Sequence, residues 1–214
     1  VTLVGTFLAL NLVVIAVSFA NIAEHPASLG NWMDSLLAAH GNPVMMLLVC
    51  LIVFPKLALG LSGFETGVAV MPQISLKPGE SAADPVSRIR GARKLLTTAA
   101  LIMSSFLVLS SVVTTVLIPA PEFQEGGTAN GRALSWLAHR LMGDGFGTVY
   151  DISTILILWF AGASAIAGLL NLIPRYLPRF GMAPEWARAV RPLVLVVILV
   201  ALAITWHFDA DVNA

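Results

Sequence analysis

Residues 60–67, GLSGFETG, place the acidic Glu65 between glycines, inside one of the longest apolar stretches of the chain. A carboxyl group at membrane depth is costly, so an acid in such a position usually serves a function. Gly60 and Gly63 weaken a helix at the same place, and Pro55 precedes them. Broken helices in a bilayer are tolerated where the freed backbone groups line a cavity or are buried in protein. In secondary transporters such breaks bind substrate and coupling ions, and this is the function we infer for the stretch.

Two other interpretations of this stretch remain open. Gly63 and Gly67 have the spacing of small residues at which membrane helices pack closely, in which case Glu65 is only hydrogen-bonded to a neighbour. Alternatively, the stretch is the nucleophile turn of a rhomboid-like intramembrane serine protease, with Ser62 as nucleophile and His207 as base. The sequence otherwise shows no metal-ligand cluster, phosphate-binding loop or pair of carboxylates. We therefore expect a protein that is not an enzyme.

The composition indicates a membrane protein. Hydrophobic residues make up 57% of the chain and charged residues 11%, and the mean hydropathy is +0.87. Soluble domains carry about 25% charged residues, so there are too few charges here to coat a soluble surface. A bilayer core about 30 Å thick needs about 20 apolar residues per helix. The sequence predicts an all-α integral membrane protein, a single transmembrane domain over 1–214 with five spans at about 1–20, 44–71, 95–118, 149–173 and 193–206.

Charged residues are distributed unevenly between the segments that connect the predicted spans. The net charge is zero, so bulk charge says nothing about nucleic acid, and we expect no nucleic-acid partner. Lys and Arg gather in 73–94 and 174–191, whereas 21–43, 119–148 and the C-terminal tail are mainly acidic. Basic loops stay on the cytoplasmic side. We therefore expect a multi-pass protein of the plasma membrane, with 73–94 and 174–191 in the cytoplasm and the acidic segments outside.

Two of the outer segments, 31–40 and 132–142, are amphipathic and predict short helices at the membrane interface. Asn31 is expected to cap the first of them, because asparagine is a favoured N-cap residue. Trp32 and Trp136 suit the aromatic belt at that level. We expect plain loop helices here rather than binding elements.

Three motifs, in order along the chain, resemble the amino acid–polyamine–organocation (APC) superfamily of permeases. Residues 54–68, FPKLALGLSGFETGV, are similar to the sixth helix of that family, where Gly-Phe-Glu follows a short unwound segment. Residues 84–92, DPVSRIRGA, resemble the inner loop that follows, with Arg90 in place of the usual proline. The stretch PRYLPRFGMAPEW is similar to the loop after the eighth helix, through Arg175, Gly181 and Pro184.

The resemblance implies an inverted-repeat (5+5) transporter fold, in which this chain corresponds to helices five to nine and the sixth is broken. It implies secondary active transport of amino acids or related small organic cations or zwitterions by alternating access, with no cofactor beyond H+ or Na+ as coupling ion. The glycine-rich break of the family's first helix has no counterpart here. We therefore expect a fragment or incomplete transporter that needs N-terminal helices or a complementary chain. A non-transporting membrane scaffold or interaction subunit is the alternative.

The same resemblance implies roles for individual residues. The unwound backbone accepts hydrogen bonds from the substrate's ammonium group, a phenyl ring packs on the substrate, and the acid couples protonation to closure. The substrate-binding residues would be Gly60, Leu61, Ser62, Gly63, Phe64 and Glu65. Ser164 falls where related folds bind sodium, and packing of small residues is its other interpretation. The aromatics that the family places before Gly-Phe-Glu are replaced here by 58–62, ALGLS, which leaves the substrate class open.

Overall fold

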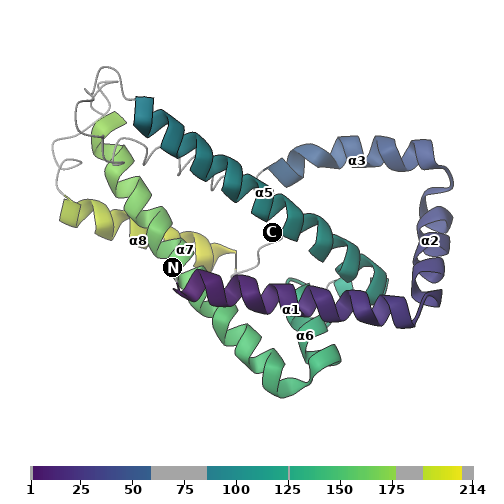
Figure 1. Ribbon diagram of the computed structural model, residues 1–214. Coiled ribbons are helices and arrows are strands. Elements are labelled where there is room, and N and C mark those ends of the chain that lie inside the picture. The colour runs from purple at the N-terminus through teal and green to yellow at the C-terminus, as the bar shows by residue number, and fades with distance from the viewer. Residues whose placement is uncertain (1, 59–85, 125, 177–189, 209–214) are drawn as a thin grey trace.

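The computed structural model describes residues 2–58, 86–124, 126–176 and 190–208 of the 214-residue chain. Within these ranges the chain is helical and contains no strand. The helices, shown in Figure 1, are α1 (Thr2–Glu24), α2 (Ala27–His40), α3 (Pro43–Ala58), α5 (Val86–Leu117), the short 3-10 helix η3 (Ala120–Phe123), α6 (Ala133–Met142), α7 (Asp144–Tyr176) and α8 (Val190–His207).

Three of these helices are long and apolar enough to cross a membrane: α1, α5 and the Asp144–Leu170 part of α7. The prediction of an all-α membrane protein is confirmed at this level. The described apolar helices Val44–Phe54 and Pro192–His207 are shorter, so the count of five spans and the inverted repeat stay predictions. Helix α5 begins nine residues before the apolar run that starts at 95, because the basic residues ahead of that run are themselves good helix formers.

Helix α1 presents a narrow stripe to the rest of the molecule. Its buried residues are Asn11, Val14, Ile15 and Ser18, at the three- and four-residue spacing that places side chains on one helix face. This stripe packs against α5, α6 and α7. The other faces of α1 carry exposed apolar side chains such as Val4 and Leu12, as expected of a helix that meets lipid or further helices.

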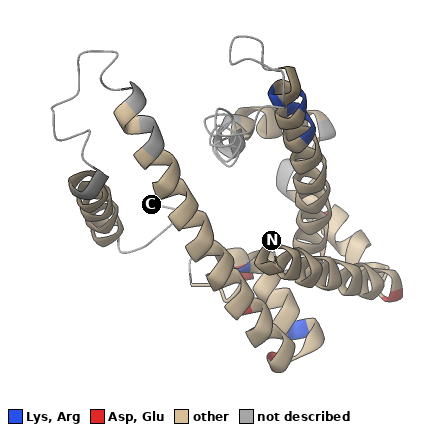
Figure 2. Ribbon diagram, turned by 60° about the vertical axis from the view of Figure 1, so that its left-hand side comes forward, with Lys and Arg blue, Asp and Glu red and all other residues tan. Residues whose placement is uncertain are grey.

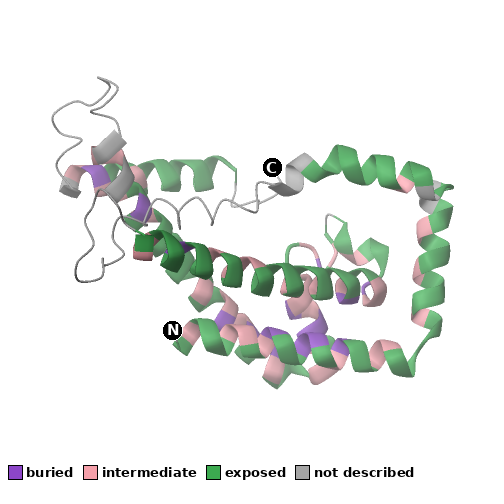
Figure 3. Cartoon of the chain, turned by 45° about the horizontal axis from the view of Figure 1, so that its top comes forward, coloured by how far each residue is buried: buried purple, intermediate pink, exposed green. Residues whose placement is uncertain are grey.

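The buried core lies where four helices meet. Val113 of α5, Leu137 and Ala138 of α6 and Tyr150 of α7 are almost fully buried together with Val14. We call this the packed region: the second half of α1, the end of α5, α6, and the start of α7. Figure 3 shows buried and intermediate residues concentrated there, while α3 and most of α5 are exposed.

One buried hydrogen bond joins α1 and α7 within the packed region. The hydroxyl of Tyr150 donates to Oδ1 of Asn11 at 2.9 Å, and Nδ2 of Asn11 donates to the carbonyl of Phe7 at 2.8 Å. Burying an amide is costly unless its polar atoms are paired, and here both are paired. The bond therefore fixes α1 and α7 in one register.

Helix α2 departs from the sequence expectation. It begins at Ala27 after Pro26, which makes no side-chain cap hydrogen bond, so the prediction that Asn31 caps this helix is wrong. Asn31 lies inside the helix, where its carbonyl accepts a hydrogen bond from the Ser35 hydroxyl at 2.7 Å. A proline at the start of a helix is favourable because its fixed φ suits the first turn, and this start outweighs the capping preference of asparagine.

Candidate functional site

Most of the residues predicted to form a substrate site lie outside the described residues. This applies to all six positions from Gly60 to Glu65, so the predicted break of the helix there stays a prediction. Ser164 is described: it lies on an exposed part of α7, and its hydroxyl donates to the carbonyl of Ala161 at 2.8 Å. His207, the base of the protease alternative, ends α8 and contacts the ring of Phe208 edge to face.

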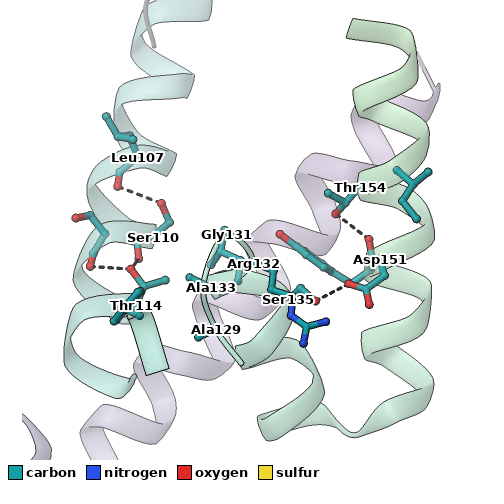
Figure 4. Close-up of a pocket in the computed structure, with 15 residues that line it drawn as sticks. Leu107, Ser110, Thr114, Ala129, Gly131, Arg132, Ala133, Ser135, Asp151 and Thr154 are labelled. Carbon is teal, nitrogen blue, oxygen red and sulfur yellow. Dashed lines mark hydrogen bonds between the residues drawn. The ribbon is translucent and has the colours of Figure 1, made fainter. Parts of the chain in front are cut away.

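The structure instead brings polar residues together in a pocket of about 680 Å³ between α5, α6 and α7. Figure 4 shows α5 and α7 on opposite sides of the pocket, with residues 129–135 between them. The polar residues that line it are Ser110, Ser111, Thr114, Arg132, Ser135, Tyr150, Asp151 and Thr154. This volume suits a small organic molecule, since a single dehydrated ion would leave most of it empty.

Three of the helix hydroxyls in this pocket already use their hydrogens. Ser110 donates to the carbonyl of Leu107 at 3.1 Å, and Thr114 donates to that of Ser110 at 2.8 Å (Figure 4). Thr154 donates to the carbonyl of Tyr150 at 2.9 Å. A hydroxyl has one hydrogen and two lone pairs, so these oxygens present acceptor sites to whatever enters the pocket.

A chain of hydrogen bonds runs along the side of the pocket formed by α6 and α7. The hydroxyl of Ser135 donates to Oδ1 of Asp151 at 2.5 Å. Nε2 of His139 lies 3.1 Å from Oδ2 of the same carboxylate, and Nδ1 lies 3.1 Å from Oδ1 of Asp144. One imidazole therefore bridges two carboxylates, while both oxygens of Asp151 are engaged by α6.

Local sequence explains how these groups meet. Ser135 and His139 are four residues apart on α6 and so share a face. Helix α6 ends at Met142 and α7 begins at Asp144, so Gly143 alone makes the turn, with a φ of 84°. This left-handed conformation is readily adopted by glycine. The turn folds α6 back along α7 and brings its histidine to the carboxylates.

A second glycine makes room for the imidazole. A Cβ placed on Gly147 would overlap His139, because the atoms nearest to that Cβ belong to the imidazole ring. Gly147 lies one turn after Gly143 on α7, between the levels of Asp144 and Asp151. Any side chain there would push the ring off the two carboxylates.

The hydrogen bond with Asp144, and next the hydrogen bond with Asp151, raise the pKa of His139 above the ordinary value of 6.5. The imidazole side chain is 34% exposed, Asp151 is 39% exposed and Asp144 is 98% exposed. The three side chains are therefore not enclosed by protein, and screening by solvent reduces the strength of such exposed charge pairs. Histidine is the side chain whose charge changes most readily in the physiological pH range, and here the two carboxylates favour its charged form.

The loop before α6 forms a second network that holds the helix start in place. Oε2 of Glu122 accepts hydrogen bonds from the amide of Thr128 at 2.9 Å and from its hydroxyl at 2.5 Å. That hydroxyl in turn accepts the indole N–H of Trp136 at 2.9 Å, and the guanidinium of Arg140 lies 5.0 Å from the Trp136 ring centroid. The two bonds from Thr128 hold the pKa of Glu122 below its usual range.

Neither Asp151 nor the role of His139 was predicted from the sequence. Both outer helices were expected to be plain loop elements and no paired carboxylates were expected, whereas the structure brings Asp144 and Asp151 around one histidine. A readable signal was present: Ser135 and His139 are four residues apart, and the two aspartates are seven apart, which puts each pair on one helix face. Among the described residues, no group of three or more His, Cys, Asp or Glu side chains could hold a metal ion.

Comparisons with protein-family models, with curated proteins and with solved structures give no match for this chain. The similarity to the APC permeases therefore stands on the three motifs in the sequence alone.

Proposed function

We propose that this chain is a membrane-embedded part of a secondary transporter of the APC permease type, which moves a small organic cation or zwitterion by alternating access. The observation that carries the proposal is Glu65, placed among Gly60, Gly63 and Gly67 in an apolar stretch that continues from α3. An acid and several glycines at membrane depth suit a broken helix with a protonatable group.

The length of the apolar stretch supports a break in this span. The stretch from Pro43 to Met71 would extend about 44 Å as one helix at 1.5 Å per residue. The bilayer core is about 30 Å thick, so a single straight helix would be too long for it. A break near Gly60–Gly63 would resolve this mismatch.

The direction of the long helices supports a transporter-like arrangement with one cytoplasmic side. Helix α7 runs opposite to α5 in Figures 1 and 2, and the Lys and Arg residues of α5 gather in its first turns. Figure 2 shows acidic residues in red toward the other end of these helices. By position in the chain, Glu24 ends α1, Glu122 lies in η3 just after α5, and Asp144 begins α7. With the basic end in the cytoplasm, the pocket between α5, α6 and α7 faces outside.

The test is uptake of radiolabelled amino acids and amines by cells that express the protein from its full reading frame. Glu65→Gln should abolish pH-dependent uptake and leave the amount of folded protein near wild type, because glutamine keeps the shape and much of the hydrogen bonding. The matched control is Glu24→Gln, an acid at the end of α1, which should leave uptake unchanged.

The other outcomes separate the alternatives. If Glu65→Gln is neutral or stabilising and uptake keeps its pH dependence, the acid is structural and the proposed proton coupling fails. If the protein shows no uptake but cleaves a membrane protein, and Ser62→Ala abolishes that cleavage while Glu65→Gln does not, a protease is favoured over a transporter.

A further inference from the structure

The contact between α6 and α7 depends on the charge state of one side chain. His139 is the only histidine among the described residues that bridges two carboxylates. From these contacts we propose that His139, Asp144 and Asp151 form a pH-sensitive clasp that holds α6 against α7 and sets how often the neighbouring pocket opens. The clasp is a property of this chain alone and does not depend on the transport function.

The chemistry of the imidazole makes the contact pH-sensitive. When protonated, both ring nitrogens carry a hydrogen and both can donate, Nδ1 to Asp144 and Nε2 to Asp151. When neutral, the ring has one N–H, and its other nitrogen turns a lone pair toward a carboxylate oxygen. One of the two attractive contacts then becomes repulsive, and the positive charge that both carboxylates share is lost.

Few other charges face the clasp. From its own segment, Arg132 lies near Asp151 and lines the pocket, while Arg140 is placed over Trp136. From α7, the hydroxyl of Tyr150 is committed to Asn11. The remaining ionisable groups of the packed helices lie elsewhere: the single one of α1 is its last residue, those of α5 lie between 88 and 94, and the acid of η3 is bonded to Thr128.

The clasp affects local separation of α6 from α7 rather than complete release of α6, because buried apolar side chains also hold α6 in place. Leu137 and Ala138 are almost fully buried in the packed region, so loss of the charge contacts does not release the helix altogether. Ala133, Leu134 and Ser135, on the first turn of α6, line the pocket. Each time the first turn of α6 moves away from α7, the pocket therefore becomes wider on the side that α6 lines.

The sign of the effect follows from the raised pKa of His139. A group whose pKa is higher in the folded state stabilises that state fully below its unfolded value, near pH 6.5, and the stabilisation is lost as the pH rises through the folded pKa. The clasp is therefore closed below about pH 6.5 and weakens as the pH rises through the raised pKa of His139.

Hydrogen exchange measured by mass spectrometry on the full 214-residue chain in lipid nanodiscs tests this. Peptides covering 133–142 are followed between pH 5.5 and 8.5, and each rate is divided by the intrinsic rate of an unstructured peptide at that pH. We expect protection of α6 to fall roughly three- to tenfold from low to high pH, since two exposed charge pairs each contribute modestly. Protection of α1 should stay constant over the same range.

Two variants and a control connect the effect to the clasp. His139→Gln should remove the pH dependence, because glutamine does not titrate. Asp144→Asn should keep a transition but move its midpoint to lower pH, since the group that raises the pKa of His139 most is lost. His25→Gln is the matched control: its ring is 3.1 Å from the carbonyl of Asn21 and meets no carboxylate in the described contacts, so the wild-type profile should persist.

Three results would overturn the proposal. These are α6 protection that does not change with pH in the wild type, pH dependence that survives in His139→Gln, and a midpoint that Asp144→Asn leaves in place. The last result keeps the test decisive even if His139→Gln fails to fold.

Discussion

Two regions of this molecule bury their side chains very differently. In the packed region, residues from α1, α5, α6 and α7 cover one another, and Leu137 is 1% exposed. On the other half of α5 and of α7, large apolar side chains lie open, with Leu101 at 66% and Trp159 at 73% exposed. Helices α3 and α8 are similarly exposed along their described lengths.

The difference shows what holds membrane helices together. Lipid tails are as apolar as leucine, so burial of apolar area alone does not bring helices together in a bilayer. The packed region has interhelical hydrogen bonds, from Tyr150 to Asn11 and from Ser135 to Asp151. On the exposed half of α5, the hydroxyl of Ser105 instead donates to a carbonyl of its own helix. The open faces are suited to lipid or to further helices, and the packed region is suited to hold its shape.

The largest expected effect comes from removing a side chain at the centre of the packed region. Leu137→Ala should lower the free energy of unfolding by about 2–5 kcal/mol, the usual cost of a cavity at a well-packed leucine. Leu101→Ala, on the open half of α5, should cost less than about 1 kcal/mol because its neighbours already leave it exposed. Equilibrium unfolding in mixed micelles measures both, and equal losses would remove the distinction between the two regions.

A smaller effect is expected from filling the space beside the imidazole. Gly147→Ala places a Cβ against the ring of His139, and overpacking of this kind costs about 1–3 kcal/mol. The matched change is Gly162→Ala on the same helix, where nothing lies within 4 Å of the added atom. It should be neutral or stabilise by up to about 1 kcal/mol through helix propensity. Gly147→Ala should lower the melting temperature while Gly162→Ala leaves it unchanged or raises it, and an equal decrease in both variants would argue against the close contact at His139.

The smallest effect concerns the hydrogen bond between α1 and α7. Tyr150→Phe leaves Oδ1 of Asn11 buried without its partner, which should cost about 1–2 kcal/mol. A double-mutant cycle with Asn11→Leu isolates the pair, and its coupling energy should be about 0.6–1.7 kcal/mol, the range found for such bonds in membranes. A coupling energy of zero would mean that apolar packing alone joins the two helices.

The sequence predicted the helical segments better than the contacts between them. Long apolar runs marked α1, α5 and α7 because bilayer thickness sets a length that composition reveals directly. The predicted start of α2 was wrong, since Pro26 rather than Asn31 precedes the helix. The capping preference of asparagine and the preference of proline for a helix start compete at such a position. The presence of one favoured residue type therefore does not decide where the helix begins.

The pocket and the clasp were harder to predict for a physical reason. The spacing of Ser135 and His139 on one helix was visible, and so was that of the aspartates on the next. That these two faces meet depends on the one-residue turn at Gly143 and on the space beside Gly147, which are tertiary properties. The predicted site at 60–65 lies outside the described residues, and its test remains the uptake experiment.

The hydroxyls of α5 have a mechanical consequence. Between Ser110 and Thr115, three side chains donate hydrogen bonds to carbonyls three or four residues earlier in the helix. Each of these carbonyls then shares its lone pairs between an amide and a hydroxyl, and such back-bonding tends to bend helices. The stiffness of α5 is therefore uneven along its length: a load applied to its two ends would concentrate curvature in these two turns, directly beside the pocket.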